Sequence, residues 1–126
     1  MTTTTTVPRV DVERFERDGY LVIRGVFSRE EVLDIRERAL RSREHRGDIL
    51  SSPLLRDVLL EGRILGIAEQ LLGGTPVYFG DASLALTASR GFHKDNTDRR
   101  DKDAPDWRSP YTNIRFGLYL QDHAQH

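Results

Sequence analysis

Residues 15–32 read FERDGYLVIRGVFSREEV, and this stretch predicts the end of a helix, a strand and the start of a second helix. Gly19 follows a short amphipathic run and is typical of the position just after a helix C-terminus. Residues 20–23 are mainly aromatic or β-branched, which favours a strand. Ser28, with Glu31 three residues later, matches the capping box that begins many helices.

Helices are expected through the first half of the chain. In the helix that begins after Ser28, Val32, Ile35 and Ala39 form an apolar stripe, and arginines alternate with glutamates on the other side. Because the two signs are interleaved, this charged surface is predicted to be a solvated helix face and not a nucleic-acid site. The expected helices cover residues 11–18, 28–44, 54–60 and 64–72, with Gly62 separating the last two and Gly73 ending the second.

Strands are expected after residue 75. Residues 77–79 and 84–87 are short apolar or β-branched runs, and residues 112–120 alternate between two faces. Helices first and strands later indicate an α+β fold. We expect residues 1–9 to be a mobile threonine-rich tail and residues 10–126 to belong to one domain, with helices to about residue 74 and strands from about residue 76.

The composition narrows the function classes. The chain has 126 residues, with 19 Lys and Arg against 20 Asp and Glu, a net charge of −1 and no cysteine. This balance predicts no nucleic-acid or membrane partner, and the lack of cysteine excludes disulfides and thiol chemistry. No apolar run reaches the ~20 residues of a membrane helix. The N-terminal threonines lack the apolar core of a secretory signal, so a cytoplasmic location is expected.

The pair His93 and Asp95 is the candidate for chemistry. In an extended chain, residues i and i+2 point to the same side, so one imidazole and one carboxylate can reach the same metal ion. Together they supply two ligands of the two-His-one-carboxylate set that leaves open positions on Fe(II). The spacing alone is common, and a surface turn in which Asp95 accepts a hydrogen bond is the alternative interpretation.

The order of several motifs resembles one family. These motifs are FERDGYLVIRGVF at 15–27, SREEV at 28–32, ILGIAEQLLGG at 64–74, the His93–Asp95 pair and IRFGLYLQDHAQH at 114–126. In this order they resemble the N-terminal portion of phytanoyl-CoA dioxygenase-like proteins, which are Fe(II)- and 2-oxoglutarate-dependent oxygenases. The resemblance implies N-terminal helices packed on the first strands of a double-stranded β-helix, or jelly-roll, barrel.

The same resemblance implies an activity. It makes His93 and Asp95 iron ligands, with 2-oxoglutarate and O2 as cosubstrates and succinate and CO2 as co-products. A carboxylate at Asp95 favours hydroxylation of an unactivated C–H bond of a small molecule, because related halogenating enzymes carry a small residue there. The family's third ligand is a distal histidine, followed by a basic residue that binds 2-oxoglutarate.

Two histidines near the end of the sequence do not fit the role of that third ligand. His123 and His126 directly follow the expected strand and are interpreted as exposed turn residues, or as an adventitious Zn or Ni site. The rest of the barrel is therefore expected in cis or on a second chain. The alternative is a truncated, non-catalytic relative of the barrel that acts as a binding or scaffold module.

Three further residues are candidates for cosubstrate or substrate binding. Arg115 and Tyr119 share one face of the expected strand by parity, so Arg115 can contact an acidic cosubstrate or form a salt bridge with a neighbouring strand. Trp107 lies in the long polar stretch 96–110, which is expected to be a lid over the substrate or a solvated loop.

Overall fold

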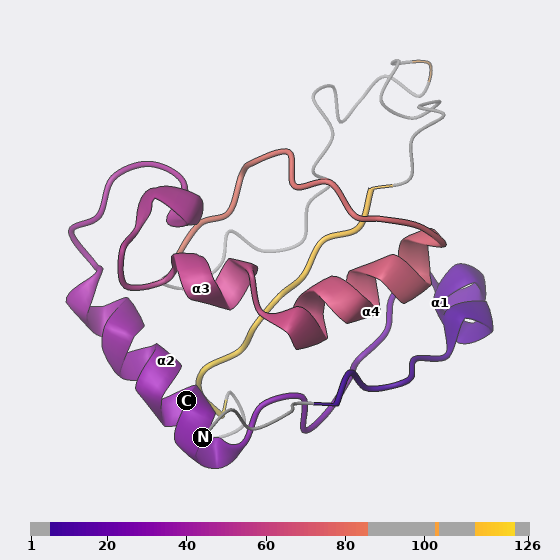
Figure 1. The fold of residues 1–126 in the computed structure, drawn as a ribbon, viewed down its shortest axis with the longest axis horizontal. Coiled ribbons are helices and arrows are strands. Elements are labelled where there is room, and N and C mark those ends of the chain that lie inside the picture. The colour runs from indigo at the N-terminus through magenta and orange to yellow at the C-terminus, as the bar shows by residue number, and fades with distance from the viewer. Residues whose placement is uncertain (1–5, 86–102, 104–112, 123–126) are drawn as a thin grey trace.

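The computed structural model describes residues 6–85, 103 and 113–122. Within these residues the chain forms α-helices and one short 3₁₀ helix (Figure 1). In chain order they are α1 (Val12–Asp18), α2 (Arg29–Arg41), η1 (Ile49–Ser51), α3 (Arg56–Leu59) and α4 (Gly62–Leu72).

The ends of α1 and α2 confirm the expected roles of Gly19, Ser28 and Glu31, and Asp11 is an additional cap. Asp11 caps α1 by accepting a hydrogen bond from the Arg14 backbone N–H at 2.9 Å, and Gly19 ends this helix with φ 79°. Ser28 and Glu31 form both bonds of the capping box at 3.2 and 3.0 Å. Each bond satisfies a backbone donor that the first turn of a helix leaves without a partner.

The boundary between α3 and α4 lies earlier than expected. Gly62 does not separate the two helices but is the first residue of α4. The Glu61 carboxylate accepts from the Arg63 N–H at 3.4 Å and takes the N-cap position, so the chain turns at residues 60–61. The C-terminal end of α4 is as expected, at Gly73 with φ 70°.

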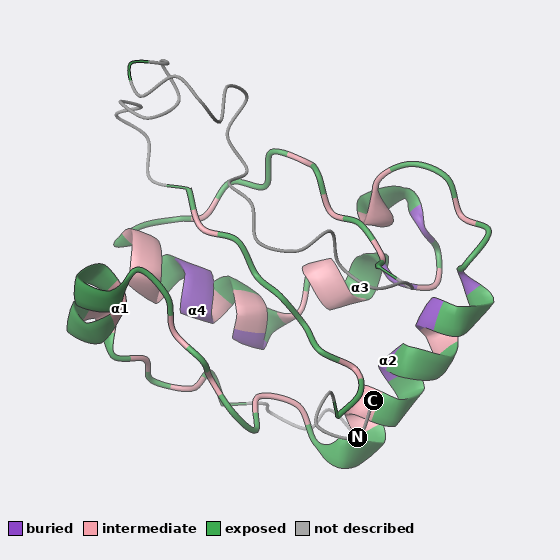
Figure 2. Cartoon of the chain, turned by 180° about the vertical axis from the view of Figure 1, so that it is seen from behind, coloured by how far each residue is buried: buried purple, intermediate pink, exposed green. Residues whose placement is uncertain are grey.

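The helices enclose a small core. α1 packs on α4, and α3 packs on η1. In Figure 1, α3 and α4 follow one another across the middle of the molecule, while α2 lies along one side. Figure 2 shows buried residues on α2 and α4 beside exposed ones, so each helix is amphipathic. The core residues are Ile35, Ala39, Leu55, Ile67 and Ala68.

The segment before α1 is tied to α4. The Gln70 side-chain amide donates to the Pro8 carbonyl at 2.9 Å, and its oxygen accepts from the Val10 N–H at 3.1 Å. Val7 lies over Gly66 so closely that a Cβ at Gly66 would come within 2.5 Å of a Val7 methyl group. We call residues 7–10 the N-terminal strap.

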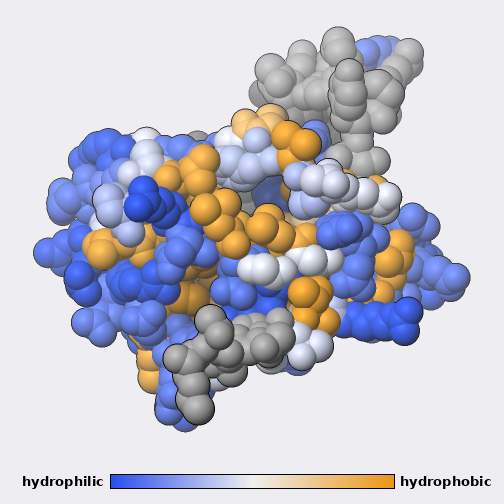
Figure 3. All heavy atoms as spheres, viewed as in Figure 1, coloured by the Kyte–Doolittle hydropathy of each residue, from blue (hydrophilic) through white to orange (hydrophobic). Residues whose placement is uncertain are grey.

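The prediction of an α+β fold with a jelly-roll barrel is wrong for the residues that the structure describes. Residues 20–23, 77–79 and 113–120 have no strand assignment, and no strand occurs anywhere in the described part of the chain. A strand exists only through hydrogen bonds to a neighbouring strand, and these runs do not pair with one another. Large apolar side chains therefore stay in solvent, with Val77 84% and Phe79 80% exposed. Figure 3 shows apolar side chains gathered across the middle of one face.

Candidate functional site

The structure describes two of the five predicted site residues. His93, Asp95 and Trp107 lie outside the described residues, as do His123 and His126. Arg115 and Tyr119 are described, and both side chains are largely exposed. The Arg115 Nη2 atom lies 3.6 Å from Asp81 Oδ2, so Arg115 forms a salt bridge, but its partner does not lie on a strand.

Neither a metal centre nor a membrane span is found in the described part. Among residues 6–85, 103 and 113–122, no group of three or more His, Cys, Asp or Glu side chains could hold a metal ion. The described helices are also too short or too polar to cross a bilayer. The predicted metal site therefore depends on the residue types of His93 and Asp95, an imidazole and a carboxylate that can each bind a metal ion.

Asp48 joins two distant segments, and we call its surroundings the Asp48–Tyr78 cluster. The Asp48 carboxylate accepts from the Tyr78 hydroxyl at 2.6 Å, from the Leu50 N–H at 2.8 Å and from the Ala82 N–H at 3.0 Å. The Ile49 N–H also donates to the Ala82 carbonyl at 3.1 Å. These bonds hold the 78–82 turn against η1.

The hydrogen bonds of this cluster change the acidity of both groups. Donation from Tyr78, and then from the backbone, lowers the pKa of Asp48 below its usual value. Partial burial, and then the bond to Asp48, raise the pKa of Tyr78. His45 lies between α2 and η1, with Nε2 3.0 Å from Ser51 Oγ and 3.2 Å from the Asp48 carbonyl oxygen. Because the Asp48 carboxylate already accepts from three donors of the fold, the cluster fits a structural clamp better than a catalytic acid.

Arg63 forms the second cluster and is the most buried charged residue described. Its side chain is 7% exposed, and its guanidinium binds both oxygens of Glu31. It also donates to Glu61 Oε1 at 2.8 Å and to the Val26 carbonyl at 2.8 Å. The Phe27 ring centroid lies 4.4 Å away, within cation–π range. Arg63 thus joins α4 to the start of α2.

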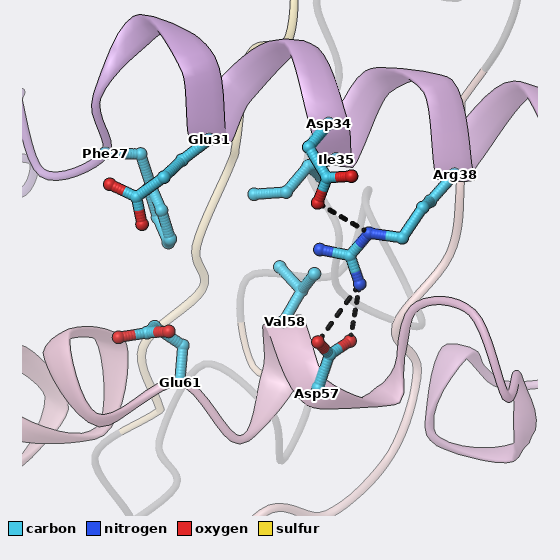
Figure 4. A pocket seen from close by; sticks show the side chains of 8 residues that line it. All are labelled: Phe27, Glu31, Asp34, Ile35, Arg38, Asp57, Val58 and Glu61. Atoms are coloured by element: carbon cyan, nitrogen blue, oxygen red, sulfur yellow. Dashed lines mark hydrogen bonds and ion pairs between the residues drawn. The ribbon is translucent and has the colours of Figure 1, made fainter. Parts of the chain in front are cut away.

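A cavity of about 90 Å³ lies between α2 and the α3–α4 region (Figure 4). Arg38 extends into it between Asp34 and Asp57. It hydrogen-bonds Asp57 at 2.8 Å, and its Nε is 3.1 Å from Asp34 Oδ2 without hydrogen-bond alignment. Ligand sites usually measure about 300–1,000 Å³, so this cavity is too small for 2-oxoglutarate. Its lining is Phe27, Glu31, Asp34, Ile35, Arg38, Asp57, Val58 and Glu61.

The sequence interpretation missed both clusters. Arg63 is a cation near the start of a mostly apolar helix, GRILGIAEQLL, and such a residue signals a buried ion pair. Asp48 follows Gly47 and precedes an apolar pair, which is an N-cap pattern. Neither pattern identifies the partner, because Glu31 and Tyr78 lie 32 and 30 residues away.

Comparisons of this chain with protein-family models, with curated proteins and with solved structures found no match.

Proposed function

We propose that this chain supplies two ligands, His93 and Asp95, to a non-haem Fe(II)- and 2-oxoglutarate-dependent dioxygenase, with the cytoplasm as its location. The single observation that carries the proposal is the His-x-Asp pair within the ordered motifs of residues 15–126. A neutral imidazole and a carboxylate are donors that non-haem Fe(II) accepts, so the donor types fit the metal. The third ligand and the cosubstrate-binding basic residue are assigned to polypeptide outside this sequence, in cis or on a second chain.

The division of roles follows from the residue types. When bound, the iron and 2-oxoglutarate supply the oxidising chemistry. His93 and Asp95 hold the metal, and their neighbour Lys94 projects to the opposite side if the segment is extended. Arg115 and Tyr119 remain proposed contacts to an acidic cosubstrate or a small substrate, and Trp107 remains a proposed lid residue.

Metal binding tests this proposal directly. The complete protein, including the polypeptide that carries the third ligand, is titrated with Fe(II) by calorimetry without oxygen, with and without 2-oxoglutarate, and the visible charge-transfer absorption is recorded. His93→Ala and Asp95→Ala should each weaken metal binding by at least about tenfold, the usual cost of losing a ligand or its support. Asp98→Asn is the matched control and should bind as wild type. Equal metal affinity in all four proteins would exclude the proposal.

A second candidate is a non-catalytic binding module. The exposed apolar side chains of Val77 and Phe79, in a run that pairs with no described strand, favour it. The discriminating experiment is complementation of a deletion strain. A binding module keeps its function in the His93→Ala/Asp95→Ala double variant, whereas a dioxygenase loses it.

A further inference from the structure

The outer face of α2 carries a seven-residue repeat that the fold does not use. The sequence RExxLxx occurs at 29–35 and again at 36–42. Leu33 and Leu40 occupy the centre of this face and are both half exposed. Seven residues make almost two full turns of a helix, so the two leucines lie one above the other. We call them the leucine seam.

Positively charged side chains lie on one side of this leucine seam, and negatively charged side chains lie on the other. At 3.6 residues per turn, the arginines fall roughly 50° to one side of the leucines and the glutamates roughly 50° to the other. The Arg flank consists of Arg29 and Arg36, and the Glu flank consists of Glu30 and Glu37. The face is therefore apolar in the middle, positive along one side and negative along the other.

These flanks differ from the inner face of the same helix. On the inner face Glu31 pairs with Arg63, and Arg38 pairs with Asp34 and Asp57. The four flank residues make no ion pair or hydrogen bond through their side chains within the described part of the chain. Figure 2 shows exposed residues along α2 beside the buried ones. The inner charges stabilise the fold, and the outer charges are open to a partner.

We infer that the outer face of α2 binds a second copy of this chain as a parallel, two-fold-symmetric helix pair. A two-fold axis along the helices places the Arg flank of one copy opposite the Glu flank of the other, on both sides of the seam. Arg29 then faces Glu30 of the other copy, and Arg36 faces its Glu37. An antiparallel pair would place like charges together on both sides, which is unfavourable.

The interface is small, and this sets the expected strength. The 13 residues of α2 span about 20 Å, and each copy contributes two leucines. The area buried by this contact is therefore smaller than the ~800 Å² per partner of a stable complex. The dimer is expected to be weak and to depend on protein concentration. The surface is distant in sequence from His93 and Asp95, and the inference is independent of the proposed oxygenase function.

Charge exchange tests the inference. Sedimentation velocity of the full chain from about 1 μM to about 1 mM should show a dimer at the high end. R29E/R36E and E30R/E37R should each weaken self-association by at least about tenfold, because both flanks then repel. Mixing the two variants should restore the dimer. A wild-type chain that stays monomeric, or a mixture that stays monomeric, overturns the proposal.

Crosslinking tests the relative orientation of the two α2 helices with single substitutions that leave the charged flanks unchanged. The chain has no cysteine, so L33C and L40C each introduce one thiol. In a parallel pair each variant crosslinks to itself under oxidation, since the same position of both copies meets at the axis. Crosslinks that form only when L33C and L40C are mixed indicate an antiparallel pair and overturn the proposal. Circular dichroism confirms that each variant keeps its helices.

Discussion

The Arg63 guanidinium binds both carboxylate oxygens of Glu31, a residue 32 positions earlier, and so connects the middle of the chain to the first turn of α2. Glu31 has two tasks at once, because the same carboxylate accepts from the Ser28 N–H in the capping box. The segment between α1 and α2 is also held at Val26, whose carbonyl accepts from Arg63.

Replacing Arg63 should destabilise the fold. Arg63→Met keeps the bulk against Phe27 but removes the Arg63 hydrogen bonds to the Val26 carbonyl and to Glu31. Loss of one partner of a buried ion pair costs about 3–5 kcal/mol. Glu31 is 42% exposed and can be hydrated, so we expect about 2–4 kcal/mol in urea unfolding. Arg17→Met, an exposed arginine of α1, is the matched control and should change stability by less than about 0.5 kcal/mol.

Acid should weaken the same connection. The hydrogen bond from Arg63, and next that from Ser28, lower the pKa of Glu31 to about 2 from an ordinary 4.5. The folded state therefore binds fewer protons than the unfolded state, and stability rises with pH in this window. We expect the contribution of Glu31 to be complete above about pH 4.5 and to be lost as the pH falls towards 2.

The urea midpoint measured at several pH values checks this window. Glu31→Gln should be less stable than wild type at neutral pH and should lose less stability on acidification. Glu16→Gln, on the exposed side of α1, is the control and should follow the wild-type pH profile. If the stability of Glu31→Gln falls with pH in parallel to that of wild type, the pH dependence does not come from Glu31.

The contact between Gly66 and Val7 leads to a prediction about the N-terminal strap. Alanine at a helical glycine usually stabilises by up to about 1 kcal/mol. At Gly66 the new Cβ would lie 2.5 and 2.7 Å from the Val7 methyl groups. We expect Gly66→Ala to cost about 1–2 kcal/mol instead, because the strap must move. Trypsin should then cleave faster after Arg9.

Two variants make this prediction specific. Gly62→Ala, on the same helix with nothing within 4 Å of its Cβ, should be neutral or stabilising. Adding Val7→Ala to Gly66→Ala removes both clashing methyl groups and should restore slow cleavage. If Gly66→Ala and Gly62→Ala behave alike, the strap does not lie where the structure places it.

Local and non-local features of the fold differ in how well the sequence predicts them. Helix ends depend on residues within one turn, so the roles of Gly19, Ser28 and Gly73 were predicted correctly. A strand depends on a partner that sequence periodicity does not identify. Residues 77–79 therefore have strand-like composition without a described strand, and the barrel that the family resemblance implied was wrong for the described part of the chain.

The candidate-site residues show the same difference between local features and features that depend on a distant partner. Salt-bridge formation by Arg115 was one of two interpretations open from the sequence, and its partner Asp81 was not identifiable. The partners of Arg63 and Asp48 lie 30 or more residues away and were missed for the same reason. His93 and Asp95 remain a prediction from residue type and spacing.

The bond between Tyr78 and Asp48 gives a prediction that can be read from a spectrum. Partial burial and the nearby carboxylate raise the pKa of Tyr78 above the ordinary 10.0. The ultraviolet titration of wild type minus that of Tyr78→Phe isolates this phenol, and its midpoint should lie above 10.0. Asp48→Asn removes the charge but not the burial, so it should lower the midpoint only in part. Asp57→Asn, whose carboxylate binds Arg38, is the control and should leave the midpoint unchanged. An Asp48→Asn midpoint equal to that of wild type would mean that the carboxylate does not contact Tyr78 in solution.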